Sequence, residues 1–168
     1  MFTKLAEQLK ANPRTIVFTE GTDARILNAA DKLTNEGILG VILIGEEAEV
    51  KKAAQEGGFH IDKCQIVNPA DYGEMEAMVE EMVRLRKGKM TEEQVRSALA
   101  QGNYFGTMLV KMGKADCLLG GATYSTADTV RPALQLIKTK PGNKIVSSTF
   151  IMVKGDEKLA FADCAINI

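Results

Sequence analysis

The sequence predicts an α/β protein: a three-layer α/β/α sandwich with a mostly parallel sheet, followed by the start of a second α/β domain. Short apolar runs alternate with longer amphipathic segments, which is typical of βαβ units with helices on both faces of a parallel sheet. After the Pro-Gly pair at 141–142 this alternation gives way to two β-type runs around a polar turn. We therefore predict one domain over residues 1–141 and the first hairpin of an incomplete second domain over 142–168.

The expected strands of the first domain are short apolar runs near turn-forming residues. Most are rich in valine, isoleucine and leucine, as strands buried on both faces require. They cover residues 15–19, 41–44, 65–67 and 115–119.

The expected helices carry apolar residues three and four positions apart, the spacing that gives a helix one buried face. In the segment 22–36 this pattern ends at Gly37, a typical helix terminator. A longer segment, 92–112, is expected to break near Gly102. The expected helices cover residues 2–10, 22–36, 47–56, 70–87, 92–112 and a last stretch ending near residue 139.

Pro132 lies inside the last expected helix, where a proline removes a backbone donor and disturbs the preceding turn. Either the helix kinks at this point, or a loose first turn precedes a helix that starts at Pro132. Both alternatives place Arg131 near the beginning of a helix.

Composition excludes several classes of function. The formal net charge is -1 and no long basic run occurs, so nucleic-acid binding has no support. No apolar run approaches the ~20 residues of a membrane span. Three widely separated cysteines and a single histidine favour reduced thiols over a disulfide or a metal site. Because the amino terminus also lacks a signal-peptide layout, the sequence predicts a cytoplasmic protein without a metal.

The most informative segment is 120–133, which follows the last strand of the expected first domain. Two glycines, the second being Gly121, allow a sharp turn and the close approach of a ligand. Ser125 and Thr126 then offer hydroxyl and N–H groups at a helix start. Arg131 adds a fixed charge with a planar set of donors. Together these groups indicate a phosphate-binding site.

A structural interpretation competes for part of this segment. Ser125 and Asp128 have the spacing of a helix capping box, which would stabilise the helix by ~1 kcal/mol. That interpretation leaves Gly121 and Arg131 unexplained. Ligands of open α/β sheets lie beyond the carboxyl ends of the strands, where this segment is expected. We therefore favour phosphate binding.

Two further arginines stand at expected helix ends. Arg25 lies in a first turn, where a cation opposes the helix dipole. It indicates either an anionic ligand or an ion pair with Glu20 or Asp23. Arg86 belongs to a basic cluster at a helix carboxyl end, where positive charge is favourable without any ligand. The residues alone leave both roles open.

These segments resemble the phosphate acetyltransferase and butyryltransferase family, and its acetyltransferase members more closely. The matching segments stand in the same order and spacing, at 19–25 (Thr-Glu-Gly-Thr-Asp-Ala-Arg), 85–87 (Leu-Arg-Lys), 125–133 and 137–139. Family members are longer, two-domain chains, so the resemblance implies that these 168 residues are an amino-terminal part. The apolar end at 165–168, untypical of a natural terminus, agrees with this expectation.

The resemblance implies reversible acetyl transfer between acetyl phosphate and coenzyme A, which yields acetyl-CoA and inorganic phosphate. It implies catalytic roles for Arg86 and Arg131, and substrate-binding roles for Arg25, Gly121, Ser125, Thr126 and Arg131. Coenzyme A is then a substrate, no cofactor is needed, and a homodimer is expected. The general base of the family is an aspartate near the carboxyl end, outside this segment. We therefore expect the 168 residues alone to be inactive.

Three alternatives stay open. Butyryl phosphate is the nearest rival substrate, because pocket shape decides acyl-chain preference. A truncated relative that only binds phosphate or coenzyme A is a second alternative. A metal-dependent decarboxylating dehydrogenase on a related fold would need a nucleotide site and clustered carboxylates, which the sequence does not show.

Overall fold

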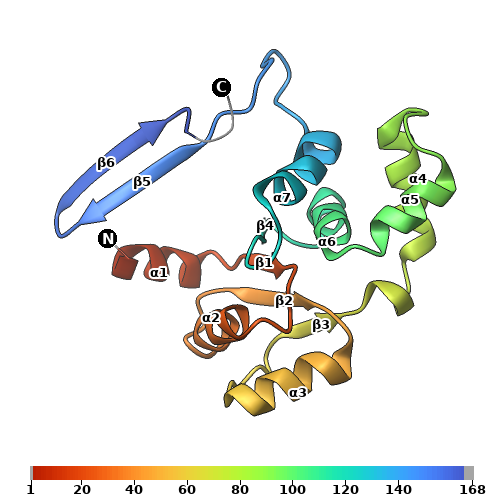
Figure 1. Cartoon of the computed structure of the whole chain (residues 1–168). Helices are drawn as coiled ribbons and strands as arrows, with labels where there is room; N and C mark the ends of the chain where they lie inside the picture. Colours follow the sequence, from red (N-terminus) through yellow and green to blue (C-terminus); the bar gives the residue numbers. More distant parts are fainter. Residues whose placement is uncertain (1, 165–168) are drawn as a thin grey trace.

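The structure, a computed structural model, describes residues 2–164. Its centre is a four-stranded parallel sheet with the strand order β3-β2-β1-β4 (Figure 1). The strands are β1 (Thr15–Phe18), β2 (Gly40–Ile44), β3 (Gln65–Val67) and β4 (Cys117–Leu119). Helices lie on both faces of this sheet, which confirms the predicted α/β fold.

Side chains of the strands alternate between two hydrophobic cores, one on each face of the sheet. Val17 of β1 belongs to one core together with Ile42 and Ile44 of β2. The neighbouring residues Phe18 and Leu43 belong to the other. Because both faces are covered, the strands need apolar residues at successive positions.

One face is covered by α2 (Ala24–Asn35) and α3 (Glu47–Gly57), which pack on Phe18 and Leu43. Gly37 follows α2 with a φ of 65°, and Gly58 follows α3 with a φ of 69°. This left-handed backbone favours glycine and ends a helix. The terminator predicted at Gly37 is therefore confirmed.

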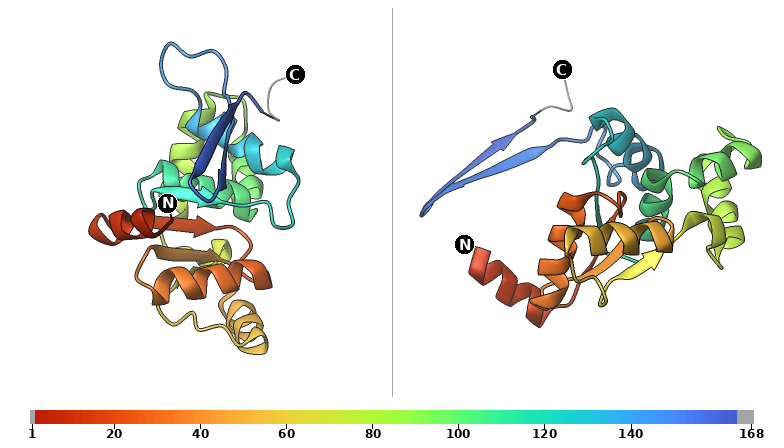
Figure 2. Two further views of the ribbon diagram at one scale, coloured as in Figure 1. Left: turned by 90° about the vertical axis from the view of Figure 1, so that its left-hand side faces the viewer. Right: turned by 60° about the horizontal axis from the view of Figure 1, so that its bottom comes forward.

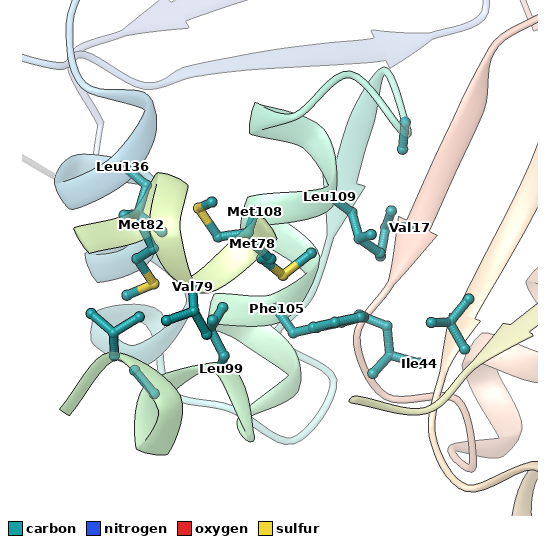
Figure 3. Packing of buried hydrophobic residues seen from close by; sticks show 14 of the residues in the cluster. Val17, Ile44, Met78, Val79, Met82, Leu99, Phe105, Met108, Leu109 and Leu136 are labelled. Carbon is teal, nitrogen blue, oxygen red and sulfur yellow. The ribbon is translucent and has the colours of Figure 1, made fainter. Parts of the chain in front are cut away.

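The other face is covered by α4 (Met75–Arg86), α5 (Glu92–Leu99) and α6 (Gly102–Lys111). Figure 3 shows methionine and leucine side chains from these helices packed around Phe105, which also meets the ring of Tyr72 edge-on at 5.1 Å between centroids. The break expected near Gly102 is confirmed, because α5 ends before it and α6 begins there.

Three expected element starts are wrong by more than one residue, one of them being the helix expected from residue 22, which begins at Ala24. The helix expected from residue 70 begins at Met75, after a short 3-10 helix, η1 (Pro69–Asp71). Asn68 caps η1 by accepting a hydrogen bond from the N–H of Ala70 at 3.0 Å, which starts a separate turn. The strand expected from residue 115 begins at Cys117.

The last helical stretch changes type at Pro132. Helix α7 (Thr126–Pro132) continues into a π-helix, η2 (Ala133–Ile137). A proline removes one i to i−4 hydrogen bond, and wider π turns occur where that ladder is disturbed. The expected start at Pro132 is wrong. Arg131 consequently lies in the last turn of α7 and not near a helix beginning.

The remaining elements lie outside the sandwich. The largely exposed helix α1 (Phe2–Ala11) precedes β1. The antiparallel hairpin of β5 (Thr149–Lys154) and β6 (Glu157–Ala162) extends away from the sheet (Figures 1 and 2). The hairpin itself was expected, whereas the domain division at residue 141 stays a prediction. The apolar end at 165–168 lies outside the described residues.

No helix within residues 2–164 has the length and apolar content needed to cross a bilayer.

Candidate functional site

The carboxyl ends of β1 and β4 lie next to each other, because Phe18 pairs with Leu119 in the sheet. The chain segments that follow these strands therefore meet at one edge. One is 19–25, and the other is 120–125, which we name the glycine loop. The predicted phosphate-binding segment thus lies at the edge of the sheet where ligands of such folds bind.

The carboxylate of Glu20 holds the glycine loop in place. It accepts hydrogen bonds from the N–H groups of Gly121 and Ala122, both at 3.0 Å, and of Tyr124 at 3.2 Å. It also accepts from the N–H of Thr123 and, at 2.8 Å, from the Thr123 hydroxyl. Glu20 is only 8% exposed. The amides of Gly121 to Tyr124, just before the predicted phosphate-binding groups of Ser125 and Thr126, are therefore bound to a carboxylate of the same chain.

The pKa of Glu20 reflects two opposing effects. Burial alone would raise the pKa of this carboxyl, because it disfavours the charged form. Hydrogen bonds from Thr123, Ala122 and Tyr124 stabilise the carboxylate and outweigh burial, so the pKa lies below its ordinary value. Glu20 is thus a stable anion at neutral pH.

Backbone geometry explains why both of these loop positions are glycine. A side chain at Gly120 would bring its Cβ within 2.6 Å of the Thr19 hydroxyl oxygen. Gly121 has a φ of 104°, which other residues rarely adopt. The glycines therefore allow the loop to close over the end of β1. A direct contact of Gly121 with a substrate stays a prediction.

Arg25 lies in the first turn of α2 and reaches the glycine loop. Its guanidinium donates to both carboxylate oxygens of Asp23, at 3.0 and 2.7 Å, and to the carbonyl oxygen of Ala122 at 2.8 Å. Among the described residues its ion-pair partner is therefore Asp23 and not Glu20. The Arg25 side chain is still 69% exposed, so it can also meet an anion from solvent.

Asp23 offsets the unfavourable position of the Arg25 charge at the helix start. It caps α2, because its carboxylate accepts from the N–H of Arg25 at 2.9 Å. The hydrogen bond from the Arg25 side chain lowers the pKa of Asp23 to about 2. This pair accounts for the arginine without a ligand, and the anionic-ligand role of Arg25 stays a prediction.

Ser125 caps α7, as the structural interpretation predicted. Its hydroxyl oxygen accepts from the N–H of Asp128 at 3.1 Å and donates to the Asp128 carboxylate at 2.6 Å. Thr126, the first residue of α7, is exposed beside it. The capping role of Ser125 is therefore confirmed, whereas phosphate binding by the two hydroxyl groups stays a prediction.

Arg131 faces a pocket between α5, α6 and α7. The pocket lining includes Ser97, Gln101 and Tyr104. The guanidinium donates to the Asp128 carboxylate at 3.3 Å, and the side chain is 54% exposed. Arg131 thus exposes part of its positively charged side chain to this pocket.

Arg86, the last residue of α4, contacts η2, the π-helix that follows α7. It donates to the backbone carbonyl of Gln135 in η2 at 3.4 Å, and Tyr104 donates to the Gln135 side chain at 3.0 Å. The Nε atom of Arg86 is buried without a hydrogen-bond partner among residues 2–164. Arg86 is thus linked through Gln135 of η2 to Tyr104 of α6, which lines the pocket that Arg131 faces. Arg25 is linked to the glycine loop through Ala122.

Sequence reasoning missed the role of Glu20. The available signal was an acidic residue directly after a buried strand, next to a loop whose amides need an acceptor. The sequence also offered no cluster of metal ligands, and none of three or more His, Cys, Asp or Glu residues occurs in the described part of the chain.

Comparison with known proteins agrees with the family resemblance. Residues 1–168 match the family described as "Phosphate acetyl/butaryl transferase". A phosphate acetyltransferase of Bacillus subtilis (strain 168) is 51% identical over the whole chain, which covers 52% of that protein. A phosphate acetyltransferase of Staphylococcus aureus (strain MRSA252) is 47% identical over 97% of the chain, which covers 50% of that protein.

Two solved structures have the same fold. A phosphotransacetylase from Streptococcus pyogenes superposes with a TM-score of 0.93 at 46% identity, over 99% of this chain and 51% of that one. A EutD phosphotransacetylase from Staphylococcus aureus gives 0.90 at 46% identity, over 98% and 50%. The chain thus spans about half the length of these relatives. Since the family match extends over all 168 residues, the chain belongs to the phosphate acetyl/butyryltransferase family.

Proposed function

We propose that the protein is a phosphate acetyltransferase, which transfers an acetyl group reversibly between acetyl phosphate and coenzyme A. The observation that carries the proposal is the match along the entire chain to proteins of that name, at up to 51% identity. Two exposed arginines support binding of an anionic substrate: Arg25, which contacts the glycine loop, and Arg131, in the helix α7 that follows this loop.

The reaction needs no redox step. The coenzyme A thiol loses its proton to a base, and the thiolate attacks the carbonyl carbon of acetyl phosphate. A carbon–sulfur bond forms, the bond between the carbonyl carbon and the bridging oxygen breaks, and inorganic phosphate leaves with that oxygen. Negative charge grows on the carbonyl oxygen and on the departing phosphate, so fixed cations lower the barrier.

In this proposal the arginines supply those cations. Guanidinium groups stay charged at any physiological pH and bind two phosphate oxygens at once. The phosphate-bearing substrate binds to Arg25, to Gly121 of the loop and to the hydroxyl groups of Ser125 and Thr126. Arg131, and Arg86 behind it, stabilise the charge that develops during transfer.

The general base is expected outside these 168 residues. Asp128 is a poor candidate, because its carboxylate already accepts from Ser125 and Arg131. We accordingly propose that the segment by itself does not turn over substrate. A homodimer, a cytoplasmic location and the lack of a cofactor or nucleic-acid partner complete the proposal, with the net charge of -1 as support for the last point.

The test is acetyl-CoA formation from acetyl phosphate and coenzyme A, measured beside the intact mass of the purified protein. Activity in a protein well above 18.2 kDa supports the proposal. A protein of that larger mass that binds both substrates but forms no acetyl-CoA contradicts it. Butyryl phosphate is run in parallel, and we expect a lower kcat/KM than for acetyl phosphate.

A further inference from the structure

The carboxylate of Glu20 takes the position that a bound anion takes in a nest of backbone amides. Successive N–H groups that converge on one point form an anion-binding concavity. Here four consecutive residues, from Gly121 to Tyr124, direct their N–H groups at Glu20. The internal carboxylate therefore fixes the conformation of the loop before any substrate arrives.

The first consequence concerns Arg25. Ala122 donates its N–H to Glu20 and offers its carbonyl oxygen to Arg25, at 3.0 and 2.8 Å. The peptide groups on both sides of Ala122 are thus held, one by a carboxylate and the other by a guanidinium. If the loop moved, Arg25 would lose its contact with Ala122 and would be held only by its two hydrogen bonds to Asp23.

The second consequence concerns α7. Tyr124, the last residue bound by Glu20, directly precedes Ser125, which caps α7. Ser125 in turn binds Asp128, and Asp128 binds Arg131. The position of Glu20 is therefore transmitted through the helix cap to the second exposed arginine.

A carboxylate accepts from this set of donors better than an amide can. It provides about four acceptor positions on two oxygens, whereas an amide provides acceptor positions on one oxygen. A glutamine at this position would direct donor hydrogens at the N–H groups of the loop. Since hydrogen bonds to a charged acceptor are roughly twice as strong as neutral ones, the exchange would release the loop.

We propose that Glu20 is a positioning residue of the substrate site, which holds the glycine loop in the shape that directs Arg25 and α7 toward the anionic substrate. This inference rests on the proposed function, because it deepens the description of the same site. Glu20 itself does not touch the substrate. It acts through the backbone of Gly121 to Tyr124.

The test compares wild type with Glu20→Gln, Glu20→Asp and Glu36→Gln in the complete, purified protein. Glu36→Gln makes the same charge change at an exposed position at the end of α2. Hydrogen exchange of the Gly121, Ala122 and Tyr124 amides, binding of inorganic phosphate by calorimetry, and KM and kcat for acetyl phosphate are measured for each.

In Glu20→Gln we expect the loop amides to exchange about tenfold faster or more, while amides of the central sheet are unchanged. Phosphate affinity should fall and the KM for acetyl phosphate should rise, each about tenfold. Glu20→Asp keeps the charge on a shorter side chain and should recover part of both effects. Glu36→Gln should match wild type.

The inference is overturned if the loop amides of Glu20→Gln keep their wild-type exchange rates, or if they exchange faster while phosphate affinity and KM stay unchanged. If Glu20→Gln does not fold, Glu20→Asp decides by the same criteria. A wild-type protein that forms no acetyl-CoA would contradict the proposed function instead. Exchange rates and phosphate binding would then still decide the role of Glu20.

Discussion

The side-chain amide of Asn103 donates a hydrogen bond to the backbone carbonyl of Asp128 at 2.7 Å. In a regular helix this carbonyl would accept from the N–H four residues later, which is the position of Pro132. Proline has no N–H, so a buried side chain of α6 replaces the missing donor. The contact explains how α7 tolerates a proline next to Arg131.

We predict that Asn103→Ala lowers the free energy of unfolding by ~1–3 kcal/mol, because it leaves the Asp128 carbonyl without its donor. The cost should be about 1 kcal/mol smaller in a Pro132→Ala background, where the restored N–H can reach that carbonyl. Urea unfolding of the four proteins in this double-mutant cycle measures both values. Equal costs in both backgrounds would show that Asn103 does not compensate for the proline.

The sheet could be predicted from sequence, but some helix boundaries could not. Short, continuous apolar runs such as 41–44 are typical of strands that are buried on both faces of a parallel sheet. Their order along the chain indicates the βαβ units. The start of α4 was misplaced because Tyr72 and Met75 both pack on the core. Their apolar spacing therefore continues through backbone that is not helical.

The place of the candidate segment in the fold could be predicted, but not its internal contacts. Gly121 and Arg131 indicated an anion at the carboxyl edge of the sheet, and the segment does lie there. Inside the site, however, the amides of Gly121 to Tyr124 bind an internal carboxylate, that of Glu20. Glu20 stands 101 positions before Gly121, and no local pattern connects them. The donor that replaces the missing N–H of Pro132 is in the same way a distant residue, Asn103.

Acid should weaken the Asp23–Arg25 pair in a defined pH range. The pKa of Asp23 is about 2 in the folded protein against 3.8 ordinarily, because Arg25 donates to its carboxylate. The unfolded chain therefore takes up this proton at higher pH, and the stabilisation present above pH 3.8 is lost as the pH falls toward 2. We predict that the difference in Tm between wild type and Asp23→Asn shrinks over this range. A constant difference from pH 6 to pH 2 would contradict the assignment.

Arg25→Ala should impair substrate binding more than stability. The Arg25 side chain is 69% exposed, so solvent screens its charge and limits the cost to folding when it is removed, although its partner Asp23 is less exposed. We predict a KM for acetyl phosphate or coenzyme A about tenfold higher, corresponding to one lost charge-assisted contact. Arg14→Ala is the control, because Arg14 is likewise an exposed arginine paired with an aspartate, Asp116, but precedes β1, at the opposite edge of the sheet. An equal change in KM in both variants would argue against a local role of Arg25.

Arg131→Ala should lower turnover far more than stability. The side chain is half exposed and contacts Asp128 across one helical turn, so we expect Tm to change by less than about 2 °C. Loss of a cation that stabilises developing charge should lower kcat about 100-fold. Arg84→Ala is a close control, because Arg84 pairs with Glu81 at the same spacing on a helix away from the loop. Steady-state kinetics and thermal unfolding of both variants provide the test, and a folded Arg131→Ala protein with wild-type kcat would exclude Arg131 from catalysis.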